Sequence, residues 1–151
     1  MNPTIFIAGD VVPMRRTAPL FQERQADVLF GAMREHICSS DVSIVNLEAP
    51  IAEKAKSRIR KSGPSLCCAS STLETLKEAG FNTITLANNH FRDYGEYGVH
   101  MRTRYIRGAY RRGWLGRVFS TPHVYEIKNK LVCQSHYDVA SQLFKLLTLD
   151  N

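Results

Sequence analysis

Acid, amide and imidazole side chains follow three short apolar segments of this 151-residue chain. Asp10 ends the first segment, Glu48 follows the second, and Asn88, Asn89 and His90 follow the third. Two carboxylates, an amide oxygen and an imidazole are donors that suit Mg²⁺, Mn²⁺, Fe²⁺ or Zn²⁺. A carboxylate that bridges two such ions would form a hydrolytic centre, and His90 could instead donate a proton to a leaving oxygen. The residue types therefore indicate metal-assisted hydrolysis.

Each of these side chains also has an ordinary structural explanation. Asp and Asn commonly form turns after strands. Glu48 precedes Ala49-Pro50 and could be a surface acid, and a single histidine such as His90 is often structural. The joint occurrence of such residues after three successive strands favours the functional interpretation.

The elements that must position these residues alternate along the chain. Residues 4–8, 42–47 and 82–87 are short and rich in β-branched side chains, as buried strands are. Helical patterns occupy residues 22–36 and 71–79 between them. This alternation predicts an α/β fold with a mostly parallel sheet. Because ligands bind beyond the carboxyl ends of such strands, the candidate residues should share one edge.

The two helical patterns have their own details. In residues 71–79, Ser71 and Glu74 have the spacing of a capping box, and Gly80 suits the left-handed position after a helix. In residues 22–36, the expected apolar face consists of Val28, Leu29, Ala32 and Met33.

The net charge of +6 comes from one segment, since residues 99–125 hold six arginines and no acid. Without those arginines the formal charge of the chain is zero. The segment lacks the pattern of a known nucleic-acid-binding module, so we do not expect nucleic acid as the partner. Residues 101–116 show neither helical nor strand periodicity, residues 124–133 resemble a hairpin, and residues 140–149 could form a short helix. Residues 53–65 are basic and loop-like, without the pattern of a nucleotide P-loop.

The composition excludes several classes of protein. No apolar run reaches the roughly 20 residues that cross a bilayer, and the N-terminus lacks the pattern of a secretory signal. We therefore expect a cytoplasmic location with reduced cysteines. The cysteines do not have the spacing of a zinc site; they are Cys38, Cys67, Cys68 and Cys133.

Three segments resemble the CapA family of capsule and poly-γ-glutamate biosynthesis proteins, relatives of calcineurin-like metallophosphoesterases. They are residues 6–12, 41–50 and 79–95, which contain Gly-Asp, Asn-Leu-Glu and Ala-Asn-Asn-His followed by Asp-Tyr-Gly. The resemblance implies a metallophosphoesterase-like layered domain of sheet and helices with a divalent-metal centre.

The resemblance also implies a role for individual residues. Asp10, Glu48 and Asn89 would be metal ligands, and His90 would contact the scissile group. Asp93, with Tyr94 and Gly95 after it, would support the loop rather than take part in the chemistry.

The chain also departs from the family pattern. A full family domain is longer and supplies further histidines. We therefore expect residues 1–99 to be the N-terminal part of a CapA-like domain, 100–121 an arginine-rich segment, and 122–151 a hairpin-like and helical remainder. This division suggests an incomplete domain from a truncated or frame-disrupted copy. The expected role is capsule or poly-γ-glutamate biosynthesis, with the synthesis machinery as the partner. The protein would act there as a metal-dependent hydrolase, or alternatively be a non-catalytic remnant or a partner-dependent subunit.

Overall fold

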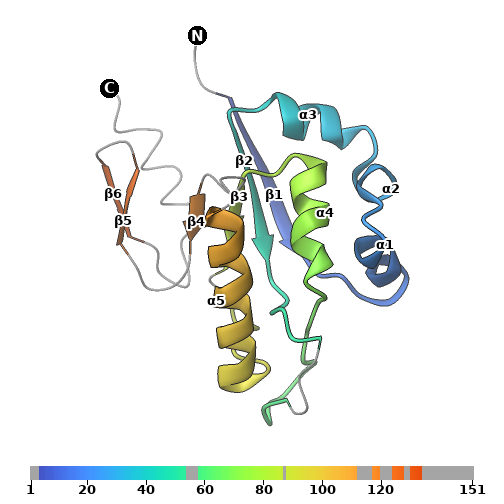
Figure 1. Ribbon diagram of the computed structural model, residues 1–151, viewed down its shortest axis with the longest axis vertical. Coiled ribbons are helices and arrows are strands. Elements are labelled where there is room, and N and C mark those ends of the chain that lie inside the picture. The colour runs from blue at the N-terminus through green and yellow to red at the C-terminus, as the bar shows by residue number, and fades with distance from the viewer. Residues whose placement is uncertain are drawn as a thin grey trace.

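The chain folds around a parallel sheet with the strand order β1-β2-β3-β4, shown in Figure 1. The computed structural model describes residues 4–53, 58–86, 88–111, 117–119, 124–127 and 130–133. The strands are β1 (Ile5–Val11), β2 (Val42–Leu47), β3 (Thr83–Thr85) and β4 (Arg117–Phe119). The predicted α/β class and the three predicted strands are confirmed, and β4 is an addition.

Helices connect the successive strands. Those between β1 and β2 group with α4 on one side of the sheet in Figure 1, and α4 contacts each of α1, α2 and α3. The helices are the 3-10 helix η1 (Arg15–Thr17), α1 (Ala18–Gln22), α2 (Ala26–Phe30), α3 (Met33–Ser39), α4 (Ser71–Ala79) and α5 (Gly95–Arg111). Within the described residues, no helix is long and apolar enough to cross a bilayer.

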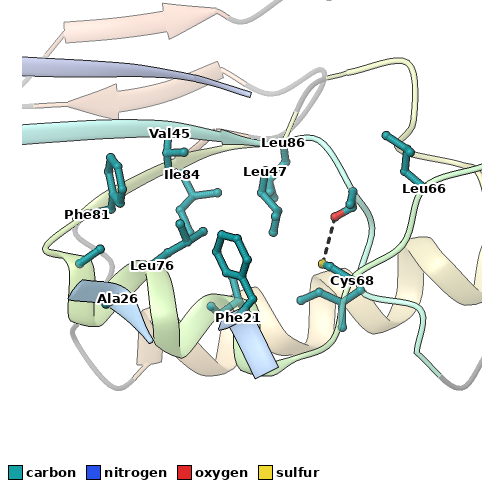
Figure 2. Packing of buried hydrophobic residues seen from close by; sticks show 14 of the residues in the cluster. Phe21, Ala26, Val45, Leu47, Leu66, Cys68, Leu76, Phe81, Ile84 and Leu86 are labelled. Carbon is teal, nitrogen blue, oxygen red and sulfur yellow. Dashed lines mark hydrogen bonds between the residues drawn. The ribbon is translucent and has the colours of Figure 1, made fainter. Parts of the chain in front are cut away.

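The core lies between the sheet and these helices (Figure 2). Val45 and Leu47 of β2 and Ile84 of β3 are fully buried and meet Leu76 of α4 and Phe21 of α1. Alternate residues of a strand face opposite sides, so one face of each strand supplies the core. This packing fixes the strands whose ends carry the candidate site.

The predicted helix over residues 22–36 is wrong in its extent. The segment forms two short helices, α2 and α3, that are separated at Gly31, whose φ is +47°. Three of the four side chains that we expected in the core are instead exposed: Val28 at 64%, Met33 at 52%, and Ala32. The break turns the chain, so a single apolar face cannot continue across it.

Helix α4 has the predicted extent but not the predicted cap. Ser70 rather than Ser71 is the N-cap residue, and its side chain makes no capping hydrogen bond. The Ser70 hydroxyl donates instead to Glu53 Oε1 at 3.0 Å. The C-terminal prediction is confirmed, because Gly80 is left-handed with φ +105°.

Substituting Gly80 tests this helix end. A Cβ there would lie 2.6 Å from the Sγ atom of Cys38, in addition to the strain of a positive φ. We expect Gly80→Ala to lower the free energy of unfolding by about 1–2 kcal/mol, measured by urea denaturation. Gly63→Ala is the control, since Gly63 has φ +83° but open space around its Cβ. Equal losses in both variants would show that the contact with Cys38 costs nothing.

The remainder of the chain is more regular than expected. We inferred no regular structure for residues 101–116, and for residues 101–111 this inference is wrong. Helix α5 continues to Arg111 and places Tyr105 against the core. The hairpin prediction is confirmed by antiparallel pairing of β5 (Val124–Ile127) with β6 (Lys130–Cys133). The helix expected at residues 140–149 lies outside the described residues.

Candidate functional site

The ends of β1, β2 and β3 lie side by side at one edge of the sheet. Asp10 of β1 pairs with Asn46 of β2, and Asn46 pairs in turn with Thr85 of β3. Glu48 directly follows β2, and its backbone N–H donates to the carbonyl of Val11 at 3.3 Å. The predicted shared edge at the carboxyl ends of parallel strands is therefore present.

A β-bulge in β1 decides which way Asp10 faces. The register with β2 shifts between Ile7 and Asp10, which inserts an extra residue into β1. Phe6 packs against the core before the bulge, and Val11 does so after it. Strict alternation would place Asp10 on the same face as Phe6, toward the helices. The bulge therefore moves Asp10 to the opposite face of the sheet.

Asn46 connects the strand ends by hydrogen bonds. Its Nδ2 donates to Asp10 Oδ1 at 2.6 Å. Its Oδ1 accepts from Thr85 Oγ1 at 3.0 Å and from Asn88 Nδ2 at 3.5 Å. One oxygen of the exposed Asp10 carboxylate is thus held by the protein, and the other stays available to a ligand. Asn46 was not among the predicted site residues, although a polar residue within an apolar strand could have indicated it.

His90 lies in the turn after β3 and is held on two sides. Its backbone N–H donates to Asn88 Oδ1 at 3.1 Å, and its ring Nδ1 lies 2.6 Å from Asp93 Oδ2. The ring Nε2 faces Glu48 Oε1 at 3.7 Å. A carboxylate on Nδ1 fixes the tautomer that leaves Nε2 for a ligand or a proton transfer. Glu48 and His90, both predicted site residues, are therefore brought together.

Asp93 holds the His90 ring in place through a buried carboxylate. Its side chain is fully buried and accepts hydrogen bonds from His90 Nδ1, the Lys61 ammonium and the backbone N–H of Leu66, the last at 2.7 Å. Burial acts to raise the pKa of Asp93, but these hydrogen bonds outweigh it and hold the pKa below its usual value. The support that the family resemblance implied for Asp93 takes the form of this hydrogen-bonding centre. Lys61 was not among the predicted site residues.

Tyr94, the partly buried neighbour of Asp93, contacts the exposed Cys67. A hydrogen bond with Cys67, together with burial, raises the pKa of Tyr94 to about 12. The phenol therefore remains protonated at neutral pH. Its contact with Cys67 joins the loop before α4 to the start of α5.

The donor set at this edge fits a hard divalent cation in chemical type. Asp10 and Glu48 offer carboxylate oxygens, and Asn89, the third predicted ligand, is exposed on the adjacent turn. In the described part of the chain, no three His, Cys, Asp or Glu side chains form a group that could hold a metal ion. A cation here would therefore need amide oxygens or water in addition to the carboxylates.

The α/β fold, with acids, amides and an imidazole at the carboxyl edge of its parallel sheet, is consistent with a metallophosphoesterase-like layered domain. The sequence matches the bacterial capsule synthesis protein family PGA_cap over residues 4–110. The chain belongs to this family. The match extends past residue 99, where we expected the CapA-like part to end, and includes most of α5.

A curated relative supports the same assignment. The chain is 30% identical to the capsule biosynthesis protein CapA of Bacillus anthracis over 98 residues. The matched region covers 64% of this chain and 24% of the relative, so the chain spans about a quarter of that protein's length. The resemblance to the CapA family is thus confirmed.

Proposed function

We propose that this capsule synthesis family member uses the edge formed by β1, β2 and β3 as a divalent-cation site for phosphoester hydrolysis. Asp10, Glu48 and Asn89 would bind the cation, which would supply Lewis-acid activation of a phosphoryl oxygen. His90 would exchange a proton with the reacting group through Nε2. The corresponding biological role is capsule or poly-γ-glutamate biosynthesis, in contact with the synthesis machinery.

The observation that carries this proposal is the orientation of His90 beside Glu48. Asp93 holds Nδ1, so the only ring nitrogen that can meet a ligand is Nε2, and it points to the Glu48 carboxylate at 3.7 Å. A side chain that served packing alone would not need a buried carboxylate on one nitrogen and a partly exposed acid beside the other. The pair therefore suits chemistry at the boundary of protein and solvent.

Thermal unfolding in Mn²⁺ tests the cation site. A ligand at ten times its dissociation constant adds about 1.4 kcal/mol of stability, so the melting temperature should rise by about 3 °C. Glu48→Gln should lose this rise because it removes a charged ligand. Glu35→Gln, an exposed position on α3, is the matched control and should keep it. The same rise in all variants, or none in the unsubstituted chain, would contradict the proposed site.

The His90→Asn variant tests the proton transfer independently of cation binding. This variant should keep the Mn²⁺-dependent rise, since His90 is not among the proposed ligands. Hydrolysis of p-nitrophenyl phosphate in Mn²⁺ should be present in the unsubstituted chain and lost in the variant. A chain that binds Mn²⁺ without hydrolysing the ester would retain the cation site but refute this chemistry.

A further inference from the structure

The segment that carries Lys61 also lines a pocket. The pocket has a volume of about 340 Å³, toward the lower end of the roughly 300–1,000 Å³ of small-molecule sites. It is lined by Arg58, Ile59, Arg60, Lys61, Gly63 and Ser65. None of these residues belongs to the proposed cation site.

The lining is strongly cationic. Three of the six lining residues carry positive charge, and residues 54–73 contain no Asp or Glu. Lys61 is paired with the buried Asp93. Among the residues that the structure describes, Arg58 and Arg60 form no ion pair. Two arginines thus line one concave space and have no carboxylate partner among the described residues.

Exposed arginines are often simply solvated, but this segment is fixed at several points. The backbone N–H of Ile59 donates to the backbone carbonyl of Asp93 at 2.9 Å, and the backbone N–H of Leu66 donates to the carboxylate of Asp93 at 2.7 Å. Lys61, between them, binds the same carboxylate. One buried residue therefore holds the beginning, middle and end of the segment, so that little ordering of the backbone would remain on binding.

We propose that this pocket binds an anionic oxygen group, either a phosphate or a carboxylate. Arg58 and Arg60 supply planar guanidinium donors that match both groups, and the Ser65 hydroxyl supplies a further donor. Because Lys61 borders the pocket and contacts His90 Nδ1 at 3.1 Å, the bound anion lies next to the candidate site. The pocket residues differ from the proposed metal ligands, so either proposal can fail without the other.

Calorimetric titration of the full chain tests the pocket with two probes, inorganic phosphate and glutarate, in metal-free buffer. At low ionic strength at least one probe should bind with a dissociation constant below about 10 mM. Arg58→Gln/Arg60→Gln should weaken that binding by at least about tenfold. Both side chains are exposed, so we expect the variant to fold.

The control removes the same charge elsewhere. Arg15→Gln/Arg16→Gln changes two exposed arginines that do not line the pocket and should leave the affinity within about twofold. Binding of phosphate alone, glutarate alone or both supports the proposal and identifies the group. Absence of binding, or equal weakening by both double variants, overturns it.

Discussion

Asp93→Ala should lower the free energy of unfolding by about 3 kcal/mol or more. The side chain is fully buried and accepts from His90, Lys61 and the backbone of Leu66. Its removal leaves all three donors without this acceptor, including the ammonium of Lys61, whose side chain is only 19% exposed. Urea denaturation at neutral pH measures the loss.

The control is a carboxylate three residues further along the chain that is not buried. Glu96 pairs with Arg92 on the surface of α5, where its side chain is 80% exposed. Glu96→Gln should change the free energy of unfolding by less than about 1 kcal/mol. A comparable loss in both variants would mean that the burial of Asp93 and its three donors are not what stabilises the turn.

The same residue predicts a pH dependence. The folded-state pKa of Asp93 lies below its unfolded value, so the stabilisation is present above the unfolded pKa and is lost as the pH falls through the folded one. The free energy of unfolding should therefore fall as the pH drops below about 4. Asp93→Asn should be less stable at neutral pH and should show a smaller decline in acid. An equal acid decline in both proteins would assign the effect to other carboxylates.

Leu47→Ala should cost about 2–5 kcal/mol of unfolding free energy. Leu47 is 0% exposed in the core, and its carbonyl accepts from Asn88 Nδ2 at 3.1 Å. The cavity would form directly before Glu48, so the acid should also lose its fixed position next to His90. Urea denaturation checks the stability, and the Mn²⁺-dependent rise in melting temperature should shrink in the same variant.

An exposed aliphatic residue gives the comparison. Val28 on α2 is 64% exposed, so Val28→Ala removes little buried surface and should change stability by less than about 0.5 kcal/mol. A Leu47→Ala loss no larger than this would show that the end of β2 is not held by the core.

The strands were predictable because short runs of β-branched residues are typical of buried parallel strands. The edge shared by Asp10, Glu48 and the residues after β3 followed from the parallel arrangement alone. The face of the sheet on which Asp10 lies could not be predicted, because strict alternation along the strand would place Asp10 on the same face as Phe6. Gly9, at the shift of register, was the available indication, because a glycine within a strand often marks a bulge.

The helices and the contacts that support the candidate site were harder to predict from the sequence. The break at Gly31 depends on a local backbone conformation that overrides an apolar pattern. The contact of Lys61 with Asp93 joins residues 32 positions apart, and no local spacing predicts such a pair. In α5, glycines and arginines obscured a helix whose described part nevertheless reaches the core through Tyr105.

The central claim is that the acids at the edge of the sheet bind one divalent cation together. The most direct measurement is an anomalous difference map from crystals of the full chain grown with Mn²⁺. We expect a peak with oxygens of Asp10, Glu48 and Asn89 at about 2.0–2.2 Å from it. An edge free of anomalous density under saturating Mn²⁺, or a peak bound by other residues, would contradict the claim.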